Sequence, residues 1–182
     1  MENSVRVVVL VFDGVEEIEA VTPVDILRRA GATVCMAAVG ARAEVTGRSG
    51  IRFQADRLAG DLDAGDFEAL VIPGGPGVAL LREDGRAERL ARGFAAADRW
   101  VAAICAAPLV LADAGLLDGR RHTAHSSTHA ALGIQEPCER VVRDGKILTS
   151  RGAGTALDFS LELVRVLIDE EKASSIAASI MA

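Results

Sequence analysis

The sequence predicts an α/β fold in which a mostly parallel central sheet lies between layers of helices. Three short and almost entirely apolar runs, at 5–12, 68–72 and 100–104, are typical of strands that are covered on both faces. Helix-like segments alternate with these runs along the chain, as a parallel sheet requires. The chain has 182 residues, of which 50% are hydrophobic, which is enough for one buried core and short for two. We therefore expect a single domain over residues 1–182.

The first half of the chain begins with a strand at 5–12. Gly14 then turns the chain into an expected helix over 15–30, with acidic residues in its first turn and arginines in its last turn, as the helix macrodipole favours. Pro23 should kink this helix. The other elements expected in this half are a strand at 33–39, short strands across 45–53 broken by glycine, a strand at 68–72 and a surface helix at 84–98.

The second half predicts further strands and helices without a repeat or a linker. The expected elements are a strand at 100–104, a helix from 106 to 115, a hairpin over 140–150 that turns at Asp144-Gly145, and helices at 155–168 and 171–181. Thr155 and Asp158 are spaced as a capping box at the start of the first of these last two helices.

The composition makes some partners improbable. The formal net charge is −6 and only 3% of the residues are aromatic, which disfavours both phosphate-backbone binding and base stacking. The N-terminal apolar run is too short for a signal peptide or a membrane span. We therefore expect a cytoplasmic protein that binds neither nucleic acid nor membranes. Three widely spaced cysteines, Cys35, Cys105 and Cys138, indicate reduced thiols.

Cys105 is the first candidate functional residue. It lies on the predicted turn between the strand at 100–104 and the helix that follows. A thiol at a helix N-terminus is expected to have a lowered pKa, because the macrodipole and the free N–H groups stabilise the thiolate. The alternative is that Cys105 is a small buried side chain of the core.

Glu19 and the glycines after the strand at 68–72 are expected close to Cys105. Helical spacing places Glu19 on an apolar face, although a kink at Pro23 would instead rotate it into solvent. Gly74 and Gly75 follow directly after their strand. The carboxyl ends of parallel strands meet at one edge of a sheet, so these residues and Cys105 should face one crevice.

The three histidines, His122, His125 and His129, are spaced by three and four residues. On a continuous helix they would share a face and bind a metal, but the serines and threonines among them favour a strand end and a loop. We therefore expect no metal site there.

Four separated motifs resemble the ThiJ/PfpI superfamily, within it the branch named for DJ-one. In chain order they are GVEEIEAVTPVDILRRAG, VIPGGPG, VAAICAAP and ILTSRGAGTALDF. The resemblance extends over nearly the whole chain. It implies a flavodoxin-like, class I glutaminase-like fold with a nucleophile elbow at Cys105.

The resemblance also implies the roles of site residues. Cys105 matches the family nucleophile, Glu19 the acid that hydrogen-bonds it, and His125 the nearby histidine, with His122 and His129 as alternatives. The backbone amides of Gly75 and Ala106 match the oxyanion-binding groups. Beside a thiolate, Glu19 is expected to have a raised pKa and to donate its proton to sulfur.

The resemblance further implies a homodimer. Arg29 and Arg48 would then line an anion-accepting mouth shared between the subunits. The alternative is that both are ordinary solvated arginines.

The function that the resemblance implies is that of a cofactor-free enzyme of the glyoxalase III or deglycase kind. It would act on methylglyoxal, glyoxal or their early protein adducts and form hydroxy acids through a Cys105 hemithioacetal. The first alternative is an oxidative-stress sensor or chaperone that signals through a Cys105 sulfinate. The second is a cysteine peptidase, although no acidic residue lies next to His125 in the sequence to orient its ring.

Overall fold

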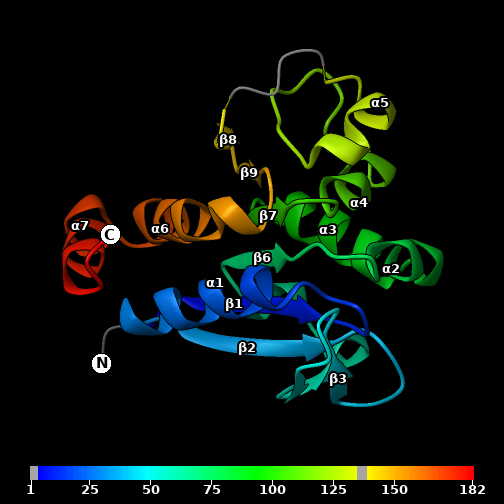
Figure 1. The fold of residues 1–182 in the computed structure, drawn as a ribbon, viewed down its shortest axis with the longest axis horizontal. Coiled ribbons are helices and arrows are strands. Elements are labelled where there is room, and N and C mark those ends of the chain that lie inside the picture. The colour runs from blue at the N-terminus through cyan, green and yellow to red at the C-terminus, as the bar shows by residue number, and fades with distance from the viewer. Residues whose placement is uncertain (1–3, 135–138) are drawn as a thin grey trace.

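Seven strands form the central sheet of the computed structural model, which describes residues 4–134 and 139–182 (Figure 1). The strand order is β5-β2-β1-β6-β7-β9-β8, and all neighbouring strands are parallel except β8 and β9. The strands are β1 (Arg6–Val11), β2 (Thr33–Ala38), β5 (Arg57–Leu58), β6 (Ala69–Ile72), β7 (Trp100–Ile104), β8 (Val141–Asp144) and β9 (Ile147–Ser150). This arrangement confirms the predicted α/β fold with a mostly parallel sheet.

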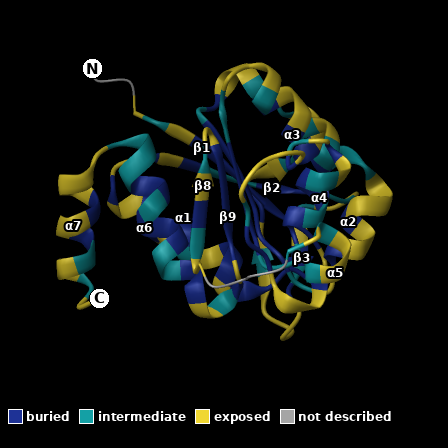
Figure 2. Cartoon of the chain, turned by 90° about the horizontal axis from the view of Figure 1, so that it is seen from above, coloured by how far each residue is buried: buried dark blue, intermediate teal, exposed yellow. Residues whose placement is uncertain are grey.

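Helices cover both faces of the sheet, so that the strands lie at the centre of the molecule (Figure 2). One face is covered by α1 (Glu17–Arg29), α6 (Ala156–Leu167) and α7 (Glu170–Ser179), and the other by α2 (Val78–Asp84), α3 (Arg86–Ala96) and α4 (Pro108–Asp113). Shorter elements are α5 (His129–Leu132), the 3-10 turns at 59–61, 64–66, 126–128 and 153–155, and an antiparallel pair formed by β3 (Glu44–Thr46) and β4 (Arg52–Gln54).

The apolar runs of the strands supply the cores on both faces. In β1, Val8 and Leu10 face one core, and Val7 and Val9 face the other, because successive side chains of a strand point to opposite faces. All four are fully buried. This two-sided burial explains why the strand sequences are continuously apolar rather than alternating.

The expected helix at 84–98 is wrong at its start. Gly85 has a left-handed conformation (φ +72°) that ends α2 and precedes α3. The sequence did not predict α2, whose residues follow the Pro-Gly cluster directly. Nor is α3 only a surface helix, because Phe94 is fully buried against the sheet.

The predicted capping box at the start of α6 is also wrong. Thr155 makes no side-chain capping bond there. Its hydroxyl instead contacts Gly152 and Ser150, and Asp158 pairs with Arg140. The predicted hairpin is confirmed, since β8 and β9 pair as antiparallel strands. Its turn is shifted by one residue from the prediction, because Asp144 still pairs with Ile147 and the two turn residues are Gly145 and Lys146.

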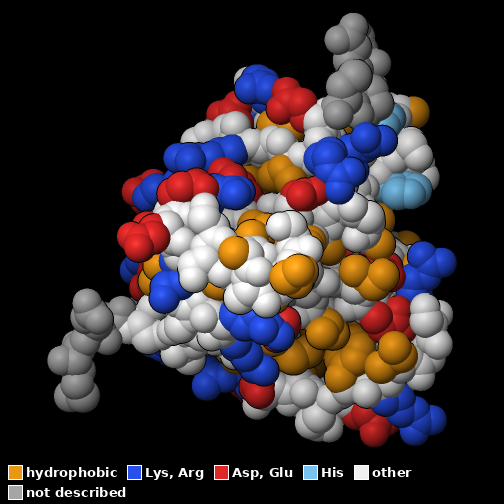
Figure 3. Space-filling model, turned by 60° about the vertical axis from the view of Figure 1, so that its left-hand side comes forward, with side chains coloured by type: hydrophobic (Ala, Val, Ile, Leu, Met, Phe, Trp, Pro, Cys, Tyr) orange, Lys and Arg blue, Asp and Glu red, His pale blue; other side chains and the backbone are white. Residues whose placement is uncertain are grey.

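Charged side chains of both signs are interspersed on the face drawn in Figure 3, which shows no broad basic surface. Many exposed arginines lie within ion-pair distance of a carboxylate, as Arg121 does with Glu139. Within residues 4–134 and 139–182, no helix combines the length and the apolar character needed to cross a bilayer.

Candidate active site

Three neighbouring parallel strands bring the candidate residues together. β1, β6 and β7 lie side by side in the sheet, so their carboxyl ends meet at one edge. Cys105 follows β7 directly, Gly74 and Gly75 follow β6, and α1 carries Glu19 back over the end of β1. The predicted convergence of Cys105, Glu19 and the glycine pair at one crevice is therefore seen in the structure.

Cys105 occupies a sharp strand-to-helix turn with a left-handed backbone. Its φ is +67°, which is uncommon for a residue with a side chain. This conformation costs about 1–3 kcal/mol, which other contacts of the folded chain must offset. Two backbone hydrogen bonds hold the turn. The Cys105 N–H donates to Ser150 O at 2.9 Å, and the His125 N–H donates to Cys105 O at 2.8 Å. This is the geometry of a nucleophile elbow, which exposes the side chain toward a crevice.

The predicted acidification of Cys105 by a helix is wrong. α4 begins only at Pro108, and it has six residues. Burial of the sulfur and the neighbouring Glu19 carboxylate raise the pKa of the Cys105 thiol to about 12. Hydrogen bonds from the backbone amides of Ala106 and Gly75 act in the opposite direction and lower this pKa. With Glu19 ionised, Cys105 is therefore a thiol at neutral pH.

Glu19 lies in the interior, with 1% of its surface exposed. The alternative in which Pro23 rotates it into solvent is therefore excluded. Its Oε2 accepts a hydrogen bond from the Gly74 N–H at 2.9 Å. Its Oε1 is buried and makes no conventional hydrogen bond within the described residues, and it faces the space between Cys105 and Gly152. One oxygen of the carboxyl is thus fixed and the other is free to exchange a proton.

The pKa of Glu19 is raised from 4.5 to about 7. A raised pKa is what the sequence predicted for this carboxyl. Desolvation by burial is the largest cause, and the nearby Glu16 carboxylate adds to it. The contact with Cys105, the Gly74 amide and the Arg48 guanidinium each lower this pKa in part. Glu19 and Cys105 form a coupled pair that titrates as a unit.

Glu16 also supports this arrangement, a role that was not predicted for it. It is the N-cap of α1, and its Oε2 accepts the Glu19 N–H at 2.9 Å. Its own N–H donates to Gly74 O at 3.0 Å. Glu16 therefore fixes the first turn of α1 against the Gly74 loop, and this contact sets the position of Glu19.

A cavity of about 340 Å³ opens in front of Cys105. It is lined by Arg48, Gly75, Pro76, Val78, Ala79, Arg82, Cys105, Ala106, Leu109, His125 and Ser127. Arg48 lies in the loop between β3 and β4 and, unlike Arg82, makes no ion pair within the described residues; Arg82 pairs with Asp113. The cavity is therefore partly apolar, with an unpaired guanidinium at its edge.

His125 is the histidine that faces this cavity. The Ser127 N–H donates to its Nδ1 at 3.2 Å, which assigns the proton of the neutral ring to Nε2. His122 lines a different cavity, and its Nδ1 contacts Arg120 O. His129 contacts Ala124 O through Nε2. No three His, Cys, Asp or Glu side chains cluster as metal ligands in the part of the chain that the structure describes.

Arg29 and Cys35 both lie outside this cavity. Arg29 lies in the last turn of α1, where it is exposed and pairs with Asp25 at 2.8 Å, and it does not line the cavity of its own chain. Its role at a mouth shared between two copies stays a prediction. Cys35 is half-buried in β2 and packs against the core, and Cys138 lies outside the described residues.

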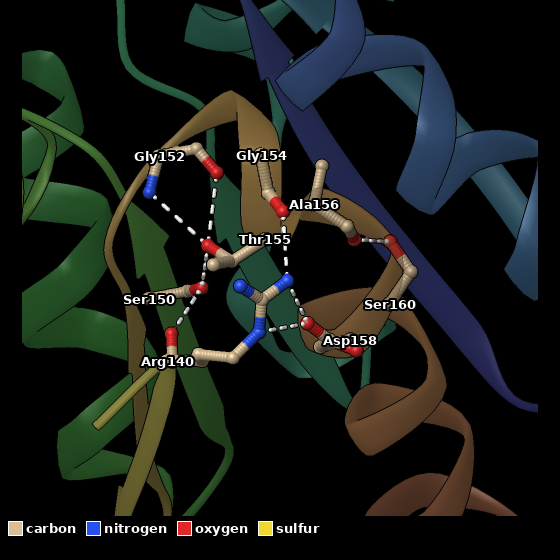
Figure 4. Close-up of polar contacts among 8 residues, drawn as sticks. All are labelled: Arg140, Ser150, Gly152, Gly154, Thr155, Ala156, Asp158 and Ser160. Carbon is tan, nitrogen blue, oxygen red and sulfur yellow. Dashed lines mark hydrogen bonds and ion pairs between the residues drawn. The ribbon is translucent and has the colours of Figure 1, made fainter. Parts of the chain in front are cut away.

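The loop between β9 and α6 also borders the site, which was not predicted. A Cβ placed on Gly152 would lie 3.9 Å from Cys105 Sγ and 3.8 Å from Glu19 Oε1, so this glycine borders the site. Thr155 holds the loop through hydrogen bonds to Gly152 (Figure 4). The only sequence signal was the SRGAGT segment between a strand and a helix, which belongs to one of the four family motifs.

Known proteins resemble the chain over nearly its whole length. It is 36% identical to Protein DJ-1 homolog B of Arabidopsis thaliana over 174 residues, which are 94% of this chain and 40% of that protein. It is 37% identical over 167 residues to a protein of Bacillus subtilis named putative cysteine protease YraA, covering 90% of this chain and 99% of that one. The chain spans less than half the length of the Arabidopsis relatives that it matches.

The fold and the family agree with these similarities. The crystal structure of Drosophila melanogaster DJ-1beta superposes with a TM-score of 0.93 at 32% identity, over 99% of both chains. The model of the DJ-1/PfpI family matches residues 5–166, which include β1, the Cys105 elbow and most of α6. The chain belongs to the DJ-1/PfpI family.

Proposed function

We propose that this protein is a cysteine-dependent enzyme that converts small 2-oxoaldehydes such as methylglyoxal, or their early adducts, into hydroxy acids. The observation that carries the proposal is the Glu19 carboxyl. Its free Oε1 is buried beside the Cys105 thiol, and its pKa of about 7 suits a group that both takes and returns a proton at neutral pH. Membership of a family with a relative named as a cysteine protease supports a cysteine-based activity in general.

The first step is attack of Cys105 sulfur on the aldehyde carbon. A bond forms between sulfur and carbon, and the thiol proton passes to the Glu19 carboxylate. The amides of Gly75 and Ala106, which already point at the sulfur, are placed to stabilise the oxyanion before it is protonated to the hemithioacetal. A base that acts during the attack is necessary because the free thiol has a pKa of about 12.

The second step moves hydrogen between the two substrate carbons. A proton leaves the former aldehyde carbon and another is returned to the neighbouring carbonyl carbon, so the first carbon is oxidised to a thioester and the second is reduced to an alcohol. The redox change is internal to the substrate and requires no external oxidant. Water then breaks the thioester and releases the hydroxy acid and the thiol. Glu19 serves as the proton carrier in this sequence.

His125 is assigned a different role from Glu19. Because its Nδ1 accepts the Ser127 N–H, the neutral ring presents an Nε2–H donor. We assign this donor to the second carbonyl oxygen of the substrate. A peptidase would need His125 as a base that a carboxylate orients, and Ser127 occupies the position of that carboxylate.

The alternative function, an oxidative-stress sensor, requires that Cys105 is already deprotonated when it meets the oxidant. Thiolates rather than thiols react readily with peroxide. Burial and the Glu19 carboxylate raise the pKa of the Cys105 thiol, which reduces the fraction of thiolate at neutral pH. The structure therefore favours an enzyme in which the thiol loses its proton only as the substrate reacts.

Lactate formation from methylglyoxal tests the proposal. Wild type is expected to form lactate over many turnovers, and Cys105→Ser is expected to be slower by at least about a hundredfold, because the nucleophile and its proton transfer are lost. Cys35→Ser, which changes a half-buried thiol outside the cavity, is the matched control and should retain wild-type activity. Equal lactate rates for wild type and Cys105→Ser would contradict the proposal.

A further inference from the structure

The hairpin of β3 and β4 carries Arg48 to the edge of the Cys105 cavity. Its tip, residues 47–51, is closed by the Gly47 N–H, which donates to Ile51 O at 2.8 Å. The Arg48 residue is exposed, and its side chain lines the cavity together with Cys105. The position of this guanidinium therefore depends on the contacts that hold the tip of the hairpin.

Backbone hydrogen bonds hold one side of the tip. The Gly14 N–H donates to Thr46 O, and the Arg48 N–H donates to Val15 O, both at 2.8 Å. Gly14 and Val15 belong to the loop between β1 and α1. These two bonds tie the start of the tip to that loop, and the Ser49 side of the tip is held by a different group.

The Glu17 side chain, at the start of α1, holds the Ser49 side. Its Oε1 accepts the Ser49 N–H at 2.7 Å, and the residue is buried. Burial raises the pKa of Glu17, but hydrogen bonds, chiefly from the Ser49 amide, outweigh this effect and lower the pKa from 4.5. At neutral pH Glu17 is therefore a buried carboxylate that accepts a hydrogen bond from the hairpin tip, and such charge-assisted bonds are stronger than neutral ones.

The hairpin backbone lies directly against the Glu17 carboxyl. A Cβ on Gly47 would lie 2.3 Å from Glu17 Oε1, 2.6 Å from its Cδ and 2.8 Å from its Cγ, so a residue with a side chain does not fit there. A carboxylate in the first turn of a helix also interacts favourably with the helix macrodipole, but that interaction requires no contact with a hairpin. The close approach and the Ser49 bond together indicate a second role for Glu17.

We propose that Glu17 is a positioning residue, which holds the hairpin tip so that the Arg48 guanidinium stays at the edge of the Cys105 cavity. As far as it concerns turnover, the inference rests on the proposed function of the same site. Burial raises the pKa of Glu19, and the Arg48 charge partly opposes this effect. Arg48 thus favours the Glu19 carboxylate that serves as the base. Glu17 itself is not among the residues that line the cavity.

Two alkylating reagents of similar size and different charge test the position of Arg48. Iodoacetate is an anion and iodoacetamide is neutral, and both react with the Cys105 thiolate. The ratio of their rate constants, obtained by peptide mass spectrometry, therefore cancels changes in the pKa of the thiol and measures the electrostatic potential at the sulfur. Low ionic strength is used because salt screens exposed charges. Cys35, which is half-buried outside the cavity, is the internal control in the same protein.

Arg48→Gln is expected to lower the iodoacetate-to-iodoacetamide ratio at Cys105 by about threefold or more, because a nearby cation is lost. Glu17→Ala removes the acceptor for Ser49 and should lower the ratio by about twofold or more, although the loss of a carboxylate alone would raise it. Glu17→Gln keeps an acceptor oxygen, so its ratio should equal or exceed that of wild type. In the Arg48→Gln background, Glu17→Ala should lower the ratio no further.

Turnover gives a second readout, which depends on the proposed function. Glu17→Ala is expected to lower kcat/KM with methylglyoxal by about twofold or more, because the Glu19 carboxylate loses a nearby cation. Glu17→Gln should restore kcat/KM to near wild type, and the loss should be absent in the Arg48→Gln background. If wild type forms no lactate, the proposed function fails, while the alkylation ratio still tests the position of Arg48.

Four results would overturn the inference. They are an unchanged ratio in Arg48→Gln, a ratio at or above wild type in folded Glu17→Ala, an equal fall in Glu17→Gln, and a further fall when Glu17→Ala is added to Arg48→Gln. Should Glu17→Ala fail to fold, Gly47→Ala tests the same contact, because its Cβ must push the tip away from Glu17. Gly40→Ala, which meets no atom within 4 Å, is the matched control. The ratio should then fall in Gly47→Ala alone, and an unchanged ratio would refute the role of Glu17.

Discussion

Glu19→Gln is expected to stabilise the folded protein above pH 7 by about 3 kcal/mol while it lowers the activity. In the unfolded chain the carboxyl has a pKa of 4.5, and in the folded protein about 7. The folded state therefore holds a proton that the unfolded state has lost between these values. Stability falls as the pH rises through this interval, and above pH 7 the cost is about 3 kcal/mol. Glutamine is neutral at every pH and still accepts the Gly74 N–H.

Urea unfolding at pH 4 and pH 8 checks this expectation. The free energies of unfolding of wild type and Glu19→Gln should be similar at pH 4, where the carboxyl is protonated in both states, and should differ at pH 8. Glu44→Gln makes the same chemical change at an exposed position and should have an effect within about 0.5 kcal/mol at either pH. A Glu19→Gln protein that is less stable than wild type at pH 8 would contradict the claim that burial destabilises the ionised Glu19 carboxylate.

Gly74→Ala is expected to lower the activity by about a hundredfold and to destabilise the protein by about 1–3 kcal/mol or more. A Cβ at this position would lie 2.6 Å from Cys105 Cβ, 2.7 Å from Glu19 Oε2 and 2.9 Å from Ile104 O. None of these atoms is the free end of a flexible surface side chain. The loop must therefore move away from both Cys105 and Glu19, and a displacement of this size at reacting groups reduces catalysis by about a hundredfold.

The matched control for this prediction is Gly40→Ala. No atom lies within 4 Å of a Cβ at Gly40, and its φ is not positive. Thermal unfolding and lactate formation measured on both variants separate a packing effect at the site from a general effect of replacing glycine. Wild-type activity in Gly74→Ala would contradict the close approach of the loop to the Cys105–Glu19 pair.

The fold followed from sequence because its strands are buried on both faces, which leaves continuous apolar runs such as Val7 to Val11. The strand ends then placed Cys105, Glu19 and Gly75 at one edge of the sheet. Helix α2 was missed because it follows a cluster of proline and glycine residues that is typical of a loop. Its boundary with α3 depends on the left-handed conformation of Gly85.

The chemistry of the site was harder to predict from the sequence than the fold. The pKa of Cys105 depends on burial and on a carboxylate 86 positions earlier in the chain, and neither effect is visible in the local turn. The role of Thr155 was mistaken for a helix cap because its contacts with Ser150 and Gly152 depend on the path of the loop. In both cases tertiary contacts outweigh the local pattern.

The pH dependence of kcat/KM for methylglyoxal tests the central claim most directly, which is that the Glu19 carboxylate removes the proton of the Cys105 thiol. In wild type, kcat/KM should rise with pH through a single group of pKa about 7. In Glu19→Gln it should be lower by about a hundredfold or more above this pH and should show no rise near 7, although loss of the negative charge lowers the pKa of the Cys105 thiol. A Glu19→Gln protein that keeps the wild-type rise near pH 7 would contradict the claim.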